Sequence, residues 1–474
     1  MVQPVRPKRV TAAGAHHPVV TSSSHQLLRS RENPLSTKSG FFDQPRGVGL
    51  IAATEFWERF SYYGFIGLAA LFMAADPATG GLGMDKGLTL KVFGLAVGMM
   101  FMAPSLGGWI ADRLIGPYGA VVIGCIGLAG ANFLLALAGT GYAHAAGLAF
   151  VFFYCGLAVM IFGAGMFKSN ISSLLGQLFT PDDSRRQDGF MLFYMGINLG
   201  ACAAPYGAGT LGELVGWSWG FLAAALGMSA GLVLFLWFSR GRFPAFVNPV
   251  PSSNDTRVEP SVWRDPGVRL VLIMVFFAAI YMIGQQTYGG VMNLYVRDRV
   301  DKTVFGFHTP TTWFLSLNPV IIMLAGPLVS KYWARHDRTA YRLPAITRIL
   351  TGTVLMALSY VLMAAVDLTA GRNLVAPMWI VVFYLVITLA ELCVFPIGLA
   401  EISRRAPRQV MGALMGLWVF TMGFGSLCAG WLGGIFSDAP AWMLFAVLAG
   451  SGSLSAAILL ALEPAIRRRF AQSE

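Results

Sequence analysis

Three charged side chains interrupt one apolar stretch, TEFWERFSYYG, which runs from Thr54 to Gly64. They are Glu55, Glu58 and Arg59, and the residues around them are those of a membrane-spanning helix. Each charge would cost roughly 2.5–3.5 kcal/mol at the centre of a bilayer. Helical spacing puts Glu55, Glu58 and Tyr62 on one face, with Arg59 one turn after Glu55. The three charges must therefore pair with one another or face a water-filled cavity.

Two more ionisable residues lie well inside apolar segments: Lys168 in GMFKSNISSLLG and Glu391 in LAELCVFPIG. Glu58 is about ten residues from the inner end of its helix and Lys168 about eight, so at 1.5 Å per residue they lie at similar depth. An alternative is that Glu55 and Glu58 are interfacial and Lys168 snorkels inward. We favour a shared cavity, in which Glu391 contributes from the opposite half.

The elements that position these residues are apolar segments of about 20 residues. The chain has 474 residues, of which 56% are hydrophobic and 12% charged, with a mean hydropathy of +0.63. A soluble domain would carry about twice that charge. Hydropathy windows predict an all-α membrane protein with twelve transmembrane helices. The expected spans are 48–75, 89–111, 118–140, 146–175, 188–210, 215–238, 268–295, 311–332, 343–366, 375–401, 409–436 and 440–462.

Polar segments divide these helices into two groups of six. Residues 1–47 are predicted to be a disordered cytoplasmic tail, since no signal-peptide core follows their basic residues. The linker 239–267 is cytoplasmic and separates bundles at 48–238 and 268–462, and 463–474 form a cytoplasmic tail. GGWIADRLIG and GPLVSKYWAR, at corresponding places in the two halves, indicate an internal repeat. Two six-helix bundles around a central cavity are typical of the major facilitator fold of secondary transporters.

The net charge of +11 does not require a polyanionic partner. With the N-terminus placed in the cytoplasm, most of the 34 lysines and arginines fall in the tails and inner loops. This distribution follows the positive-inside rule. We therefore expect a lipid bilayer as the environment, both termini in the cytoplasm, and no nucleic-acid partner.

The sequence offers no metal site and no nucleophile with a base beside it. Its five cysteines are widely separated inside predicted spans, without the spacing of metal ligands. His144 and His308 fall in expected outer loops, and no histidine lies in a span. We therefore expect no metal, no cofactor and no enzyme activity.

The charged stretch also carries a resemblance. EFWERFSYYG matches the ExxERFxYYG motif of the proton-dependent oligopeptide transporter (POT) family within the major facilitator superfamily. Further similar segments are FYMGINLGACAAP, GWSWGF, FKSNISSLLG, SLNP, AELCVFPIGL and MGLWVF. The similarity covers nearly everything after the N-terminal tail, in the family's order.

The resemblance implies a proton-coupled symporter that imports di- and tripeptides through the inner membrane by alternating access, with protons as the coupling ion and a monomer as the working unit. It assigns proton coupling and carboxylate binding to one cluster and the peptide amino group to Glu391. The cluster comprises Glu55, Glu58, Arg59 and Lys168. The implied pocket residues are Tyr62, Tyr63, Asn198, Asn318 and Trp418.

The residue types suit this chemistry independently of the family. The amine and carboxylate of a dipeptide are about 6–7 Å apart, because backbone geometry fixes them. Glu391 in one half, opposite Arg59 and Lys168 in the other, could hold both ends. Three carboxylates and two cations leave the empty cavity at −1, which one proton neutralises; a buried site is least costly at zero charge. The two asparagines could instead bridge helices, and Trp418 could face lipid or the core.

Some positions depart from the family pattern. An arginine after YYG and a glutamate in helix seven are replaced by Ile66 and Gln285. Both members of an outer-gate ion pair are thus missing, and we expect the gate to close by packing or amide hydrogen bonds. Phe101 and Phe395 replace polar pocket residues, which leaves the substrate's side-chain selectivity open. Another small solute, such as nitrate, an amino-acid conjugate or a drug, is the alternative cargo.

Overall fold

The computed structural model describes residues 44–45, 47–180, 183–239, 260–304, 306–336 and 344–470. The predicted N-terminal tail therefore falls outside the described residues except at its end, as do most of the linker and the last four residues. The segment from Gln44 onward forms one compact unit. Nearly all of its described residues are helical, as the hydropathy predicted.

The first half of this unit is built from six long helices with short helical connections. The long helices are α2 (Val48–Ala74), α3 (Lys86–Ile110), α4 (Gly116–Ala138), α6 (Ala149–Gln177), α7 (Arg186–Ala204) and α9 (Trp217–Ser239). The connections are η2 (Pro77–Thr79), η3 (Ala111–Ile115), α5 (Gly141–Ala145), η4 (Pro205–Gly209) and α8 (Thr210–Leu214). The α7, η4 and α8 elements follow one another without a break, so they make a single pass.

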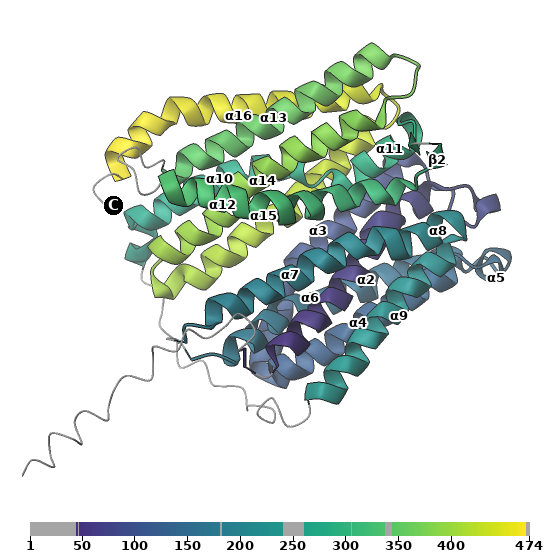
Figure 1. Ribbon diagram of the computed structural model, residues 1–474, viewed down its shortest axis with the longest axis horizontal. Coiled ribbons are helices and arrows are strands. Elements are labelled where there is room, and N and C mark those ends of the chain that lie inside the picture. Colours follow the sequence, from purple (N-terminus) through teal and green to yellow (C-terminus); the bar gives the residue numbers. More distant parts are fainter. Residues whose placement is uncertain are drawn as a thin grey trace, which may run out of the picture. The chain divides into compact units, whose positions relative to one another are not determined.

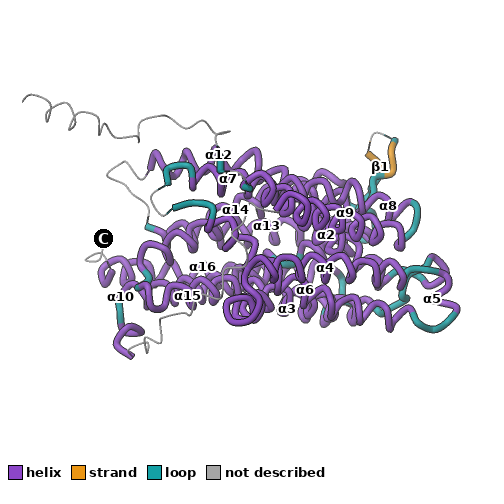
Figure 2. The backbone as a smooth tube through the Cα atoms, turned by 90° about the horizontal axis from the view of Figure 1, so that it is seen from below, coloured by secondary structure: helices purple, strands orange, loops and turns teal. Residues whose placement is uncertain are grey.

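The second half has the same number of passes. Its long helices are α10 (Pro266–Gln285), α12 (Leu317–His336), α13 (Ala345–Ala370), α14 (Pro377–Arg405), α15 (Arg408–Ile435) and α16 (Ala441–Phe470). The shorter elements are η5 (Pro260–Arg264), η6 (Tyr288–Met292), α11 (Asn293–Arg299), β1 (Thr303–Val304), β2 (Phe307–His308) and η7 (Thr311–Ser316). The antiparallel β1–β2 hairpin lies at the same end as α5 and α8 (Figures 1 and 2).

The predicted twelve passes are confirmed. Among the described residues, nine helical segments are long and apolar enough to span a membrane, and one of them, Lys86–Ala138, contains both α3 and α4. The remaining two passes are α2 and the α7–α8 unit, which are not among the nine. Helix α2 falls outside the nine although it is buried in the bundle, because it carries the charged cluster at Glu55, Glu58 and Arg59.

Helices pack against each other within each half, and the two halves are also in contact. Helix α2 lies against α7 and α9, and α4 against α6, while α13 lies against α14 and α16 (Figure 1). Between the halves the main helical contact is α3 with α15. Glycines allow it: a Cβ atom on Gly94 would lie 2.8 Å from the Cα atom of Gly430. Small residues at such a crossing let two membrane helices approach closely.

Polar contacts between the halves gather at one end, which we call the distal end: the end at which α2 stops and α3 begins. There Lys86 Nζ lies 3.0 Å from Asp298 Oδ2, and Asn293 Nδ2 donates to the Gly67 carbonyl at 2.7 Å. The hydrogen bonds and ion pairs that join the halves through described residues all lie in the distal part of the helices. The structure is therefore a distally closed state.

Glu213 of α8 makes the largest of these contacts. Its Oε2 accepts from the Thr311 amide at 2.8 Å, and its Oε1 accepts from the amide and hydroxyl of Thr312 at 2.7 and 2.8 Å. The carboxylate thus satisfies donors at the start of η7, which belongs to the other half. Free amides at a helix start favour a negative partner, so this contact, here called the Glu213 clasp, stabilises the closed state.

Candidate functional site

Helix α2 positions a buried charge cluster. Arg59 Nε donates to Glu55 Oε1 at 2.8 Å and lies 2.9 Å from Glu58 Oε2. The two glutamate side chains are 1% and 0% exposed. The Glu55–Arg59 pair has the four-residue helical spacing that the sequence indicated. Two carboxylates share one guanidinium, so the ionised cluster would carry a net negative charge inside the protein.

The carboxylate oxygens of this cluster are poorly satisfied. Both oxygens of Glu58 and the Oε2 atom of Glu55 are buried without a hydrogen-bond partner among the described residues. A buried carboxylate without hydrogen bonds is costly in its charged form. Taking up a proton removes that cost, so the local structure suits a group that changes its protonation state.

Lys168 of α6 lies near the α2 cluster, and the Tyr62 ring is in contact with both Lys168 and Arg59. The Lys168 Nζ atom lies 4.1 Å from the centre of the Tyr62 ring and 4.7 Å from that of Phe101. The Arg59 guanidinium carbon lies 5.6 Å from the same Tyr62 ring. Lys168 forms no ion pair with a described carboxylate, so it does not pair with Glu58 as their similar depth allowed. Its charge is stabilised by aromatic faces and remains available to an anion.

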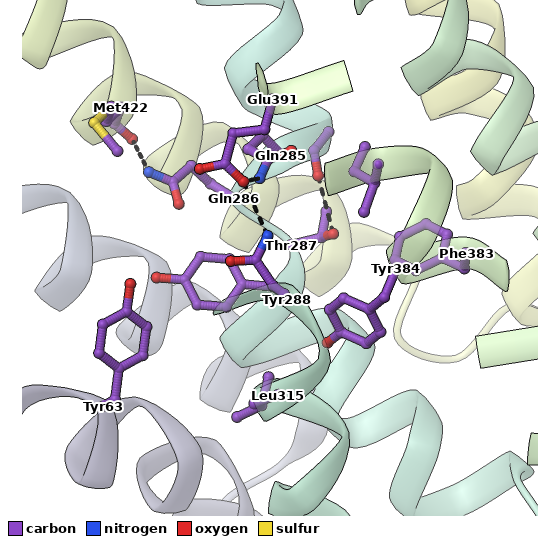
Figure 3. A pocket seen from close by; sticks show the side chains of 13 residues that line it. Tyr63, Gln285, Gln286, Thr287, Tyr288, Leu315, Phe383, Tyr384, Glu391 and Met422 are labelled. Atoms are coloured by element: carbon purple, nitrogen blue, oxygen red, sulfur yellow. Dashed lines mark hydrogen bonds between the residues drawn. The ribbon is translucent and has the colours of Figure 1, made fainter. Parts of the chain in front are cut away.

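Glu391 of α14 is held through one oxygen. Its Oε2 atom accepts from Gln285 Nε2 at 2.8 Å and from Asn318 Nδ2 at 2.9 Å (Figure 3). Asn318 is itself fixed by a second bond, 3.0 Å to Thr388 Oγ1. The Oε1 atom of Glu391 has no partner among the described residues and is not sealed from the cavity. It can accept a hydrogen bond from a ligand.

Glu391, Gln285 and Asn318 line a pocket between the two halves, whereas Lys168 and the charged residues of α2 lie outside its lining. The lining residues are Tyr63, Gly284, Gln285, Gln286, Thr287, Tyr288, Leu315, Asn318, Phe383, Tyr384, Ile387, Glu391 and Met422. Tyr63 comes from α2, and its hydroxyl end turns toward that of Tyr288 from the second half (Figure 3). The sequence missed Tyr288 and Tyr384, because an aromatic residue in a span looks the same whether it faces a cavity or the core. The Gly289–Gly290 break beside Tyr288 was the one available signal.

Tyr62 was predicted to line the pocket, but it is 1% exposed, packs under Lys168 and lies outside this lining. Two further predicted pocket residues also lie elsewhere. Asn198 is buried and donates to the Tyr194 carbonyl of its own helix at 2.9 Å. Trp418 is 0% exposed and packs on α14: a Cβ atom at Gly398 would lie 2.0 Å from its indole ring. The structure therefore assigns Trp418 to the contact between α14 and α15, and neither residue lines this pocket.

The predicted gate pair is not formed. Ile66 is fully buried and packs against η6, where a Cβ atom on Gly289 would lie 2.6 Å from its Cγ2 atom. Gln285 lies one turn earlier and binds Glu391. The two positions do not face each other because the seventh pass, which comprises α10, η6 and α11, is interrupted between Gln285 and Gly289. The distal end is closed at Ile66 by packing and at Asn293 by a neutral hydrogen bond, as expected from the missing ion pair. The Glu213 clasp adds a charged contact that the sequence did not indicate.

The fold and the site together define a class. Two six-helix bundles with a pocket between them, and with buried charged groups inside each half, are typical of a major facilitator secondary transporter. The profile of the POT family matches residues 118–254 and 267–447, and the chain belongs to that family. It is therefore a multi-pass membrane transporter and not an enzyme, as the sequence predicted.

Known relatives are similar over almost their whole length. The chain is 31% identical to the peptide transporter YePEPT of Yersinia enterocolitica subsp. palearctica serotype O:3 (strain YE-P4), covering 90% of this chain and 96% of that protein. It is 29% identical to the uncharacterized transporter YclF of Bacillus subtilis (strain 168), covering 91% and 96%.

Solved structures are similar to the same extent. The peptide transporter POT in complex with sulfate superposes with a TM-score of 0.80 at 28% identity, covering 91% of this chain and 96% of that one. A POT family transporter in complex with 5-aminolevulinic acid has a TM-score of 0.82 at 25% identity, covering 90% and 98%.

Proposed function

We propose that this protein is a proton-coupled symporter that imports di- and tripeptides by alternating access. The observation that carries the proposal is a pair of buried opposite charges in different halves: Glu391 on the pocket, and Lys168 over the ring of Tyr62, the neighbour of the pocket residue Tyr63. Glu391 in the second half presents an open carboxylate oxygen, while Lys168 in the first half presents an ammonium group that pairs with no carboxylate of the described residues. The peptide transporters among the relatives support the same cargo class.

A peptide would bind by its two ends. Its ammonium group would meet Glu391 Oε1, and its carboxylate would meet Lys168 and Arg59. Tyr63 and Tyr288 line the pocket with Glu391 and offer hydroxyls and ring faces that do not depend on the peptide's side chains. Because the two ends engage different halves, a bound peptide draws the halves together. The site reads the length and the terminal charges of the cargo.

The proton would bind to the α2 cluster. With both cations and all three carboxylates ionised, the cavity carries one net negative charge, and a zwitterionic peptide adds none. A proton on Glu58 or Glu55 brings the total to zero and removes the charge from a buried carboxylate that has unpaired oxygens among the described residues. Enclosing the loaded site is least costly in that neutral state. One proton per peptide is the stoichiometry that this counting favours.

The distribution of lysines and arginines supports an orientation in the membrane. We place the protein in the cytoplasmic membrane with both termini in the cytoplasm, the distal end outside, and a single chain as the transport unit. An inward proton gradient would then drive import. Protons are the coupling ion, and the mechanism uses no other cofactor.

The test is uptake of labelled dialanine by proteoliposomes with an acidic exterior. Accumulation should require the gradient, and unlabelled dialanine should abolish it while free alanine should not. N-acetyl-dialanine and dialanine amide should each compete poorly, because each lacks one charged end. Equal competition by the blocked and unblocked peptides would contradict the two-ended site.

A second candidate cargo is a small amino acid conjugate or analogue that carries an amine and a carboxylate at a similar separation. The structural neighbour bound to 5-aminolevulinic acid favours it, since that molecule has both groups. In the same assay, competition by 5-aminolevulinic acid with no effect of dialanine would select this alternative.

A further inference from the structure

Gln285 occupies the last position of α10, where helix seven is interrupted. Its side-chain carbonyl Oε1 accepts a hydrogen bond from the Tyr281 hydroxyl at 3.0 Å, and Tyr281 is fully buried. A hydroxyl that donates to the carbonyl fixes the orientation of the amide, because the NH₂ group must then point the other way. Here it points at Glu391 (Figure 3).

The Gln285 amide donates a hydrogen bond to one oxygen of Glu391 and does not bind the other. Gln285 and Asn318 both donate to Oε2, from α10 and α12. Two donors on one oxygen turn the carboxylate so that Oε1 remains for a ligand. Hydrogen bonds to an ionised acceptor are stronger than neutral ones, so these amides also favour the charged form that an ammonium group needs.

We propose that Gln285 is a positioning residue for the substrate's amine, and that it acts without exchanging a proton. The proposal rests on the proposed function, in which Glu391 binds the peptide ammonium group. A carboxamide donates its hydrogen bond at every working pH. An acid at the same place would lie 2.8 Å from Glu391 and share a proton with it. With Gln285 present, proton exchange is confined to the α2 carboxylates of the other half.

The experiment compares two competitors of labelled dialanine uptake: unlabelled dialanine, and propionyl-alanine, which lacks only the amine. The inhibition constant of propionyl-alanine divided by that of dialanine measures how strongly the site discriminates in favour of the amine. Gln285→Met keeps the length of the side chain and removes the amide. We expect the ratio to fall about tenfold, through weaker dialanine binding, with the propionyl-alanine constant unchanged.

Gln286 supplies the matched control. It is the adjacent glutamine in the same pocket, but its Nε2 atom donates to the Met422 carbonyl at 3.3 Å and not to Glu391. Gln286→Met should leave the ratio of the two constants unchanged, whatever it does to the transport rate. Tyr281→Phe removes the donor that orients the Gln285 amide, and should lower the ratio in the same direction but less.

A third variant tests the proton. In Gln285→Glu the pair of acids would share a proton at low pH and lose it at higher pH, so its amine discrimination should rise from mildly acidic to mildly alkaline buffer. The native ratio should stay constant over that range. A merely structural side chain would not introduce this pH dependence.

The outcomes separate the two claims. If the native protein does not discriminate dialanine from propionyl-alanine, the proposed amine site is wrong. If it discriminates and Gln285→Met discriminates equally, Gln285 has no positioning role. If Gln285→Met does not fold, Tyr281→Phe decides, and an unchanged ratio in that variant overturns the inference.

Discussion

Two carboxylates and one guanidinium share the interior of α2, and their contacts are unequal. Glu55 has a well-formed hydrogen bond to Arg59, whereas Glu58 is close to the same nitrogen but neither of its oxygens is hydrogen-bonded within the described part of the chain. The less satisfied carboxylate gains more from protonation, because a buried charge without hydrogen bonds is the most expensive arrangement. At the scale of single residues, Glu58 is therefore the stronger candidate for the proton that accompanies the substrate.

Glu58→Gln keeps the shape of the side chain but cannot release a proton. We expect peptide exchange to persist when both sides of the membrane contain peptide, because that cycle does not require deprotonation. Accumulation driven by a proton gradient should be lost. Both activities are measured in one proteoliposome preparation, and a protein that has merely unfolded would lose the two together. Full gradient-driven uptake by this variant would remove Glu58 from the mechanism and leave Glu55.

Lys168 has aromatic partners and no ion-paired carboxylate among the described residues. Lys168→Met should therefore weaken binding of dialanine at least tenfold, since hydrogen bonds to charged groups contribute about 1.5–3 kcal/mol, while thermal stability changes little. Competition by dialanine amide, which has no carboxylate, should be unaffected. Lys331→Met, on the exposed side of α12, is the control. Equal weakening of both competitors would show that Lys168 does not bind the carboxylate.

At the scale of elements, distal closure combines two kinds of contact. Glycines bring α3 within backbone contact of α15, and the Glu213 clasp joins α8 to the start of η7. Transport requires these contacts to separate while each half stays intact. Separating α3 from α15 mainly breaks packing contacts. Opening the Glu213 clasp instead leaves three hydrogen-bond donors, two amides and one hydroxyl, without their carboxylate acceptor. The clasp therefore sets a large share of the balance between the closed and open states.

Glu213→Gln replaces one accepting oxygen by an NH₂ group, which cannot accept from a Thr311 or Thr312 amide. We expect the ratio of distally open to closed molecules to rise about tenfold, equivalent to about 1.4 kcal/mol. Spin labels at Thr79 and Arg372, on exposed distal turns of the two halves, report the change as a longer distance.

The control is Glu401→Gln, whose carboxylate pairs with Arg404 and Arg405 within α14. It should leave the distal distance unchanged. An identical distance distribution in Glu213→Gln and the native protein would mean that the clasp does not hold the distal end closed.

At the scale of the whole molecule, the sequence predicted the features that depend on local composition: the membrane-spanning segments and the charged residues inside them. All twelve passes were placed, because hydropathy over about 20 residues decides whether a segment can span a bilayer. The largest error is at the end of the last one: α16 continues to Phe470, eight residues into the predicted C-terminal tail and beyond the expected end at residue 462. The charged members of the site were identifiable for the same reason: a charge inside an apolar helix must have a structural or functional partner. Glu55, Glu58, Arg59, Lys168 and Glu391 needed no knowledge of the fold to be selected.

The rest depended on how helices turn and where they break. Trp418 was expected in the pocket and lies in the core, because a small rotation of α15 decides which neighbour it meets. Gln285 was expected to face Ile66 and instead binds Glu391, because helix seven is interrupted just after it. Glu213 was not selected at all, since its partners are backbone amides about 98 residues away in the chain. Such contacts have no local sequence signal.

Proton movement with peptide is the central claim, and one measurement tests it directly. Proteoliposomes containing the native protein and a pH-sensitive dye are prepared without any ion gradient, and dialanine is added outside while uptake of labelled peptide is followed in parallel. We predict that the lumen acidifies as dialanine enters, with about one proton per peptide, and that alanine produces no change. Entry of labelled dialanine without acidification of the lumen would contradict proton-coupled transport.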